Sequence, residues 1–175
     1  NHEIMALTCL KLLMNEITDD FLEQLSPEDM AQLADWTRNG SSSTISEFTK
    51  LSPEERNDVL DFIGEFETYA ELDINGQKYL LVHAGLDHFS EEKAIDEYTI
   101  DDLVWMRTDY EIPYYEDTIV VTGHTPTQYI LGNPRPGYIY KAKNHIALDC
   151  CACSDKGRLA GICLETGEEF YSRND

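Results

Sequence analysis

Basic side chains are scarce in this sequence. Lys and Arg number 13 against 34 Asp and Glu, which gives a formal net charge of −21 and a pI near 4.3. Nucleic-acid backbones and anionic membrane surfaces are both bound through clustered Lys and Arg, so the composition argues against either partner. An anionic substrate would need a local source of attraction, such as bound metal ions. Without such a site, the acidic excess serves solubility alone.

Long apolar runs are also missing. No stretch approaches the roughly 20 residues that a membrane-spanning helix needs, and no secretory signal is recognisable. We therefore expect a cytoplasmic protein. With 175 residues, 42% of them hydrophobic, the chain is long enough to bury a core and should form one domain or part of one.

An initiator methionine is absent as well. The sequence opens with Asn1-His2-Glu3. We expect the functional unit to extend upstream of these residues.

A disulfide framework is not expected, because the five cysteines are odd in number and unevenly spaced. Three of them lie together in Cys150-Cys151-Ala152-Cys153. Adjacent thiols can bind soft metals, but the spacing is not Cys-x-x-Cys, and neighbouring strand residues point to opposite faces. We expect these cysteines to act as small buried hydrophobes.

The first third of the chain is predicted to be helical. Apolar residues recur at helical spacing over 3–15. Ser26 and Ser52 each precede a proline and acidic residues, which is typical of helix starts, and Glu55 completes a capping box with Ser52. The polar segment 36–44 is expected to be a flexible connector. The helix after Ser52 should place these residues on one side: Val59, Leu60, Ile63 and Phe66.

From residue 69 onward, the pattern favours strands. Residues 69–74 alternate, Asn75-Gly76 is a strong hairpin signal, and 77–83 form the returning strand. The acidic and aromatic segment 87–115 is predicted to contain loops and short helices. Further strands are predicted at 119–122, 138–140, 144–151, 158–164 and 168–171, the last three of them antiparallel.

Two of the predicted strands end at a histidine. Residues 79–82 are apolar and lead to His83, followed by a break at Ala84-Gly85, and 118–126 have the same design around His124. Open α/β sheets bind their ligands at the carboxyl ends of strands. One histidine in such a place would be interpreted as a satisfied core residue, but the matched pair favours two metal ligands.

Three blocks resemble a known family in their order and spacing: Asn1-His2-Glu3, His83-Ala84-Gly85 and Gly123-His124-Thr125. They are similar to the GNHE, HAG and GHT blocks of the calcineurin-like metallophosphoesterases. The likeness is greatest to the bacterial serine/threonine phosphoprotein phosphatase branch, and it extends over essentially all 175 residues. The supporting motifs are Trp36-x-x-Asn39-Gly40, Leu103-Val104-Trp105-Met106-Arg107, Gly123-His124-Thr125-Pro126-Thr127, Leu148-Asp149-Cys150 and Gly157-Arg158-Leu159.

The resemblance implies an α/β (α+β) fold, a metallophosphoesterase-type β-sandwich flanked by helices. Residues 1–175 would be the C-terminal part of a single metallophosphoesterase domain that starts inside the GNHE motif and lacks the N-terminal strands. The implied activity is that of a metal-dependent phosphoric monoester hydrolase, a protein serine/threonine phosphatase that uses two metal ions and a metal-bound hydroxide. Its substrates would be phosphorylated proteins or small phosphoesters.

The resemblance also assigns roles to individual residues. Asn1, His83 and His124 would bind the second metal, His2 would be the catalytic general acid, and Arg107 would hold the phosphoryl oxygens. Two metals about 3.5–4 Å apart can generate hydroxide near neutral pH, and the arginine fork matches phosphate geometry. Nitrogen and oxygen donors without thiolate suit Mn²⁺, Fe or Zn²⁺.

The sequence departs from the family in one respect. The Asp-x-His-Gly and GDxxDRG blocks, which hold the first metal and supply the bridging aspartate in the family, do not occur here. We therefore expect at most a partial metal site and little or no phosphatase activity from these residues alone, although the parent protein would be active. The face left by the missing strands would favour self-association.

Two other functions stay open. One is a diadenosine tetraphosphatase or another nucleotide hydrolase of the same superfamily. The other is a non-catalytic phosphate-binding or regulatory module that has lost the metals.

The remaining aromatic and histidine residues are assigned structural or peripheral places. Trp105 is expected to be a core anchor for the arginine two residues further on. His88 and His145 match no motif and should lie at the surface or in strand packing. Trp36 and Asn39 are candidates for the rim of a substrate cleft.

Overall fold

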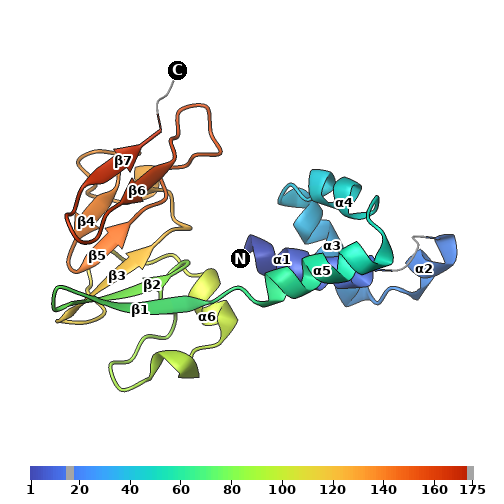
Figure 1. Ribbon diagram of the computed structural model, residues 1–175, viewed down its shortest axis with the longest axis horizontal. Helices are drawn as coiled ribbons and strands as arrows, with labels where there is room; N and C mark the ends of the chain where they lie inside the picture. Colours follow the sequence, from blue (N-terminus) through green and yellow to red (C-terminus); the bar gives the residue numbers. More distant parts are fainter. Residues whose placement is uncertain (15–17, 173–175) are drawn as a thin grey trace. The chain divides into compact units, whose positions relative to one another are not determined.

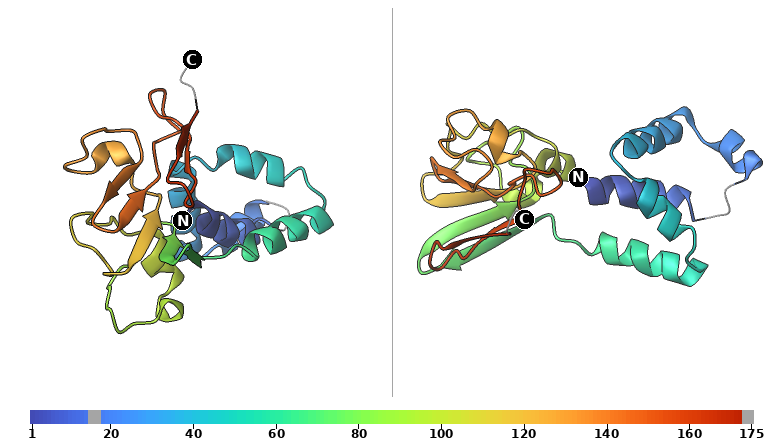
Figure 2. Two further views of the ribbon diagram at one scale, coloured as in Figure 1. Left: turned by 60° about the vertical axis from the view of Figure 1, so that its left-hand side comes forward. Right: turned by 90° about the horizontal axis from the view of Figure 1, so that it is seen from above.

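The computed structural model describes residues 1–14 and 18–172, and the chain forms two compact units, Asn1–Phe66 and Glu67–Asp175 (Figure 1). The first unit is built from helices, and the second carries the strands of the described residues. Figure 2 shows the elements of each unit from two further directions. The mixed α/β class predicted from the sequence is therefore confirmed. Within the described ranges, none of the helices has the length and apolar character that crossing a membrane demands.

Helix starts in the first unit follow the predicted capping chemistry. The Ser26 Oγ accepts a hydrogen bond from the Asp29 N–H at 3.1 Å, and the Asp29 carboxylate accepts one from the Ser26 N–H at 3.2 Å. Ser52 and Glu55 form the same reciprocal box. The helices are α1 His2–Leu12, α2 Asp19–Gln24, α3 Pro27–Arg38, α4 Ser42–Phe48 and α5 Pro53–Gly64.

The core of the first unit gathers apolar side chains from several helices. Val59, Leu60 and Ile63 of α5 pack against it, as predicted. Phe66 does not, because it lies past the end of α5, where it is exposed and its ring meets Phe62 edge to face at 5.0 Å. The buried residues of this core are Cys9, Leu10, Leu13, Trp36 and Phe48.

The connector predicted at residues 36–44 is wrong. α3 continues past Trp36 and α4 begins at Ser42, so the link between them is short. Trp36 is 3% exposed, and burying its large indole in the core favours helix over a polar loop. Its burial also excludes the predicted place at a cleft rim. Asn39 caps the end of α3, where its side-chain amide donates to a carbonyl of the last turn at 2.9 Å.

The second unit is organised by a mixed five-stranded sheet in the order β1-β2-β3-β5-β4. β1 and β2 form the predicted hairpin, and Asn75 (φ 55°) and Gly76 (φ 81°) both adopt the left-handed backbone of its tight turn. β2, β3 and β5 run parallel to one another. The strands are β1 Tyr69–Ile74, β2 Gln77–Val82, β3 Thr118–Thr122, β4 Tyr140–Ala142, β5 His145–Ala147, β6 Ala160–Ile162 and β7 Glu169–Tyr171.

Both faces of this sheet are covered. Alternate residues of a strand point to opposite faces. One face, with Leu80 and Val120, packs on a cluster that includes α6 (Ile100–Val104). The other face, with Leu81 and Val121, packs against residues of β6 and β7. The short helices η1 Ile95–Glu97 and α6 lie in the segment predicted to hold loops and short helices, and η2 Thr127–Tyr129 lies after β3.

The predicted direction of β5 is wrong. β6 and β7 are antiparallel, as predicted, but they form a two-stranded sheet of their own, and β5 pairs parallel to β3. β5 is also shorter than predicted, and β4 begins at Tyr140, later than predicted. A tight turn at Lys143 (φ 50°) and Asn144 (φ 59°) joins β4 to β5, and the Asn144 side chain donates to the carbonyls of Tyr115 and Glu116.

The cysteines after β5 do not behave alike. Cys150 is 2% exposed and acts as the predicted small hydrophobe. Cys151 is only half-buried and Cys153 is exposed. The prediction is wrong for these two because the strand ends at Ala147, before it reaches them.

His145 is a packed residue of β5, as predicted. It is 1% exposed, and its ring meets those of Tyr110 and Tyr114 at 5.4 and 5.2 Å. Its Nε2–H donates to the Ile112 carbonyl at 2.9 Å, whereas Nδ1 has no partner among the described residues. His88, by contrast, is exposed, which also agrees with the prediction.

Removing the Ser52 cap should destabilise the helical unit. We expect Ser52→Ala to lower the free energy of unfolding by about 1 kcal/mol, because the Glu55 N–H loses its acceptor at the start of α5. Urea denaturation followed by helix circular dichroism measures this. Ser43→Ala, at an exposed position inside α4, is the matched control and should cost little. Equal losses in the two variants would contradict the capping role.

His145 should make stability depend on pH. Burial lowers the pKa of its imidazole below the ordinary 6.5, with the Ile112 carbonyl and Asp109 acting in the opposite direction. Below about pH 6.5, the unfolded chain therefore binds a proton that the folded chain does not, and this stability contribution is lost as the pH falls.

We accordingly expect His145→Gln to lose less free energy of unfolding than the wild type between about pH 7 and about pH 5. Chemical denaturation at a series of pH values measures the two slopes. Ser43→Ala, which changes an exposed residue that does not titrate, should keep the wild-type slope. Parallel slopes for wild type and His145→Gln would show that burial of this imidazole does not affect the pH dependence.

Candidate functional site

The candidate site lies at the carboxyl ends of the parallel strands β2 and β3. His83 directly follows β2, and Gly123-His124 directly follow β3. The Gly123 N–H donates to the His83 carbonyl at 2.8 Å, which continues the pairing beyond the strands. The ring centroids of His83 and His124 are 5.1 Å apart, and their planes are tilted by 56°. The fold thus brings together the two histidines singled out in the sequence.

His124 is held in an unfavourable backbone conformation. Its φ of 59° is left-handed, which is uncommon for a residue other than glycine. Backbone strain of this kind concentrates at functional sites. Burial, and after it the positive charge of Arg107, lower the pKa of the His124 imidazole below 6.5. The ring is therefore neutral at neutral pH, which is the form that binds metal ions.

Arg107 reaches the same edge of the sheet from the loop after α6. Its Nη1 donates to the His124 carbonyl at 2.7 Å and lies 3.4 Å from the Thr125 Oγ1. The side chain is exposed. A planar guanidinium anchored in this way can present its fork to an anion. The arginine predicted to bind phosphate therefore lies beside a histidine predicted to bind metal.

Hydroxyl groups hold the loop that carries Arg107. The Thr108 Oγ1 donates to the Ala84 carbonyl at 2.8 Å, and the Tyr114 hydroxyl accepts from the Leu86 N–H at 3.1 Å. Ala84 and Leu86 belong to the segment that follows His83. Buried hydrogen bonds therefore connect the loop of Arg107 to this segment.

The prediction that Trp105 anchors the arginine in the core is wrong. Trp105 is 42% exposed, and its ring meets that of His124 edge to face at 6.4 Å. Leu103 and Val104 fill the core at the end of α6, so the chain has turned outward before it reaches the tryptophan. The anchoring is done instead by the neighbouring hydroxyl groups.

Gly85 leaves space for this arrangement. A Cβ at this position would fall inside the contact distance of the Thr108 side chain and 2.8 Å from both the Tyr114 hydroxyl and the Met106 sulfur. Its φ of 151° is also unfavourable for other residues. The glycine after Ala84 is thus explained by close packing of the two loops.

Asp149 also acts on this edge, although the sequence analysis assigned it no role. It follows β5, the third parallel strand, and its carbonyl accepts from the Thr127 N–H at 2.7 Å. Burial has the largest effect on the pKa of His124, and the Asp149 carboxylate opposes it by raising that pKa. The strand predicted at 144–151 ran through Asp149, whereas β5 ends at Ala147, so the position of this carboxylate just after a parallel strand was not recognised.

A cleft of about 720 Å³ opens beside Arg107. Tyr129 and Leu131 contribute exposed apolar surface to its lining, and Asp109 and Glu111 contribute negative charge. A cleft with an apolar lining and a few charged groups can receive a small ligand or a peptide segment.

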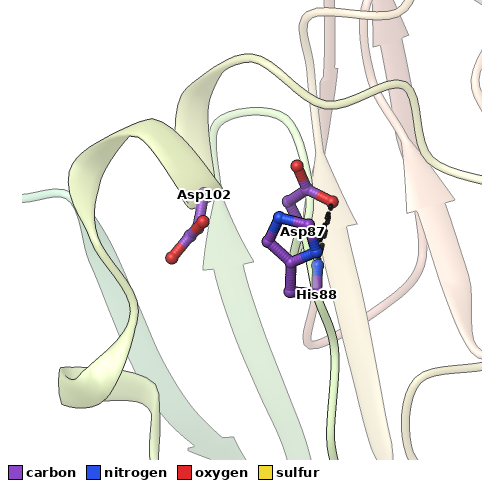
Figure 3. A group of neighbouring side chains, drawn as sticks. All are labelled: Asp87, His88 and Asp102. Carbon is purple, nitrogen blue, oxygen red and sulfur yellow. Dashed lines mark hydrogen bonds and ion pairs between the residues drawn. The ribbon is translucent and has the colours of Figure 1, made fainter.

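A second group of metal-ligating side chains consists of Asp102 on α6 and of Asp87 and His88 on the neighbouring segment after β2 (Figure 3). Asp87, His88 and Asp102 each place one ligand atom within 4.8 Å of the others. Asp102 already caps α6 by accepting from the Thr99 N–H at 2.9 Å, and it lies 3.6 Å from the Lys93 ammonium. The Asp87 carboxylate accepts from the His88 N–H at 2.9 Å. Capping and local hydrogen bonds account for this cluster, so we do not assign it as a metal site.

The other two predicted site residues belong to the first unit. Asn1 is the N-cap residue of α1, and its carbonyl accepts from the Met5 N–H at 3.1 Å. His2 is the first residue of the helix and is exposed. Their roles as metal ligand and general acid stay predictions.

Comparison with known proteins adds no assignment. No protein-family model matches the chain, and no curated protein matches it at a significant level. The functional argument therefore depends on the motifs and on the geometry of the site.

Gly85→Ala should disturb the loop that carries the arginine. We expect a loss of about 1–3 kcal/mol in the free energy of unfolding, because the added methyl group meets Thr108 and Tyr114 in a strained backbone conformation. Urea denaturation measures the loss. Gly123→Ala is the matched control, since a Cβ there meets only the His83 carbonyl, at 3.6 Å. An effect no larger than the control's would refute the close packing at Gly85.

Proposed function

We propose that the chain supplies part of the dinuclear centre of a calcineurin-like metallophosphoesterase of the bacterial serine/threonine phosphoprotein phosphatase branch. The observation that carries this proposal is the pairing of the His83 and His124 rings at 5.1 Å, with Arg107 bonded to the same loop. The proposed reaction is hydrolysis of phosphate monoesters, with phosphoserine and phosphothreonine in proteins as the substrates.

The spacing of the two imidazoles suits one shared cation. If a divalent ion were bound, the imidazoles of His83 and His124 would hold it, because both rings lie at the ends of neighbouring parallel strands. Their ring centroids are 5.1 Å apart. Imidazole and oxygen donors suit Mn²⁺, Fe or Zn²⁺. When bound, divalent ions supply the positive charge that activates water and stabilises the phosphoryl oxygens.

The protein groups have separate tasks in this proposal. Arg107, restrained by its bond to the His124 carbonyl, binds two phosphoryl oxygens through its fork and orients the phosphorus atom. The family resemblance gives His2 the role of general acid and Asn1 that of a metal ligand, and both roles stay predictions. The apolar and acidic cleft beside the arginine receives the polypeptide around the phosphorylated residue.

We also propose that the second unit is the C-terminal part of the metallophosphoesterase β-sandwich. The packing of β6 and β7 against the face of the larger sheet that bears Leu81 and Val121 supports a two-layer arrangement. In this proposal, the N-terminal strands and the ligands of the first metal come from residues other than 1–175. The Asp-x-His-Gly and GDxxDRG blocks that would supply them do not occur in the sequence.

Removing either imidazole should weaken metal binding. We expect His83→Ala and His124→Ala to raise the dissociation constant for Mn²⁺ about tenfold or more, because each loses one of few ligands. The electron paramagnetic resonance signal of free Mn²⁺ measures the binding. His88→Ala removes an exposed histidine outside the proposed site and should bind like the wild type. Unchanged binding in both site variants, or no saturable binding by the wild type, would refute the site.

Turnover separates the proposed substrate from the alternatives. With the two upstream blocks joined to the chain, we expect Mn²⁺-dependent release of phosphate from a phosphoserine peptide and a strong loss of release in Arg107→Ala. The 175-residue chain alone should release far less phosphate from p-nitrophenyl phosphate. Preference for diadenosine tetraphosphate would indicate a nucleotide hydrolase. Phosphate binding without turnover would indicate a non-catalytic module.

A further inference from the structure

Two thiols face each other in the loop after β5. The Sγ atoms of Cys151 and Cys153 are 3.9 Å apart, within hydrogen-bonding distance for sulfur. Cys153 is exposed and Cys151 is half-buried, so small solutes can reach the pair. Neither thiol has a part in the proposed phosphatase site.

The backbone of the loop holds the two residues together. Cys151 has a left-handed φ of 58°, and its carbonyl accepts from both the N–H and the Oγ of Ser154, at 3.0 and 3.1 Å. Gly157 packs against this carbonyl so closely that a Cβ there would overlap it. The loop is therefore a hydrogen-bonded turn, and it places the Cys153 side chain next to that of Cys151.

The other three cysteines lack these features. Cys9 and Cys150 are buried, at 1% and 2% exposure. The Cys163 thiol donates to the Glu165 carboxylate at 3.2 Å. Among the five cysteines, accessibility and a facing thiol thus coincide only in the loop pair.

We propose that Cys151 and Cys153 are a reversible oxidation site, which forms a disulfide within the loop when the protein meets a low-molecular-weight disulfide. Closing the bond requires the sulfur atoms to approach from 3.9 Å to about 2.05 Å, which side-chain rotation and a small adjustment of the turn can supply. A metal site is disfavoured, because no third His, Cys, Asp or Glu of the described residues forms a ligand group with this pair. The hydrogen bond with Cys151 raises the pKa of the Cys153 thiol, so the attacking thiolate is a minor form and the oxidation is slow.

The chemistry balances with glutathione disulfide as the oxidant. Cys153 gives its thiol proton to water, its thiolate attacks one glutathione sulfur, the oxidant's S–S bond breaks, and one glutathione leaves as a thiolate that takes up a proton. Cys151 then loses its proton in the same way, and its thiolate attacks the Cys153 sulfur of this mixed disulfide. The second glutathione leaves as a thiolate and is protonated by water. Two protein thiols are oxidised to one disulfide, and one glutathione disulfide is reduced to two glutathione molecules.

Oxidation at this place would act close to the candidate site. The Cys151 N–H donates to the Asp149 carboxylate at 2.8 Å, and the Asp149 carbonyl accepts from the Thr127 N–H at 2.7 Å. Thr127, which is fully buried, lies three residues after His124. The oxidation site itself does not rest on the proposed phosphatase function.

Peptide mapping tests the proposal directly. The reduced 175-residue chain is treated with glutathione disulfide, denatured, alkylated with iodoacetamide and cleaved with trypsin after Lys143 and Lys156. The peptide of residues 144–156 contains three of the cysteines. We expect this peptide to be two hydrogen masses lighter than the fully reduced form and to carry one alkyl group, on Cys150. After reduction with dithiothreitol and a second alkylation, all three cysteines should be alkylated.

Two variants sharpen the result. Cys153→Ser changes an exposed residue and should abolish the loop disulfide, leaving glutathione attached at Cys151 or no modification at all. Cys163→Ser removes a thiol outside the loop and should leave the disulfide intact. A bond between Cys150 and Cys151, bonds between chains only, or three unmodified thiols in the treated wild type would overturn the proposal.

Discussion

The parallel pairing of β2 with β3 is the constraint on which the candidate site depends. Leu81 lies opposite Val121 in the register, and the Gly123 N–H continues the ladder by donating to the His83 carbonyl. Each such bond adds only about 0.5–1.5 kcal/mol, but together the bonds specify which residues leave the sheet side by side. A slip of one residue would move each side chain of the strand to the opposite face of the sheet. The apolar side chains packed on both faces therefore stabilise the observed register.

The loops beyond the strands are less regular, and they are held by side chains instead. Thr108 and Tyr114 attach the arginine loop to the segment after His83, while Arg107 itself bonds the strained backbone of His124. Gly85 permits this close approach because any side chain there would occupy the space of its neighbours. The loops after β2, after β3 and after α6 therefore meet at one edge of the sheet, and different side-chain hydrogen bonds hold them there.

Features decided by local chemistry could be predicted from the sequence. The hairpin at Asn75-Gly76 and the capping box of Ser52 with Glu55 depend on a few adjacent residues, and both formed as predicted. The approach of the two histidines was also predictable, because two apolar strands that end alike tend to lie side by side when parallel.

Features decided by distant packing could not be predicted. Trp36 is buried in the core of the helical unit, whereas Trp105 is exposed at the surface of the second unit. The residues that neighbour each tryptophan in the sequence indicate neither outcome. The direction of β5 depends on its partner β3 and on a left-handed turn at Lys143 and Asn144. Of these two, only the asparagine is a usual turn residue, and the prediction placed it inside a strand. The roles of Asp149 and Cys151 were not predicted, because the strand predicted at 144–151 ran through both residues, whereas β5 ends at Ala147.

The central claim is that the imidazoles of His83 and His124 converge on one cation. Anomalous diffraction at the manganese edge, from crystals of the chain equilibrated with Mn²⁺, tests it most directly. The account predicts a single strong peak within coordination distance of a ring nitrogen from each histidine. A map with no peak between the two rings, or with its only peak at the Asp87, His88 and Asp102 cluster, would contradict it.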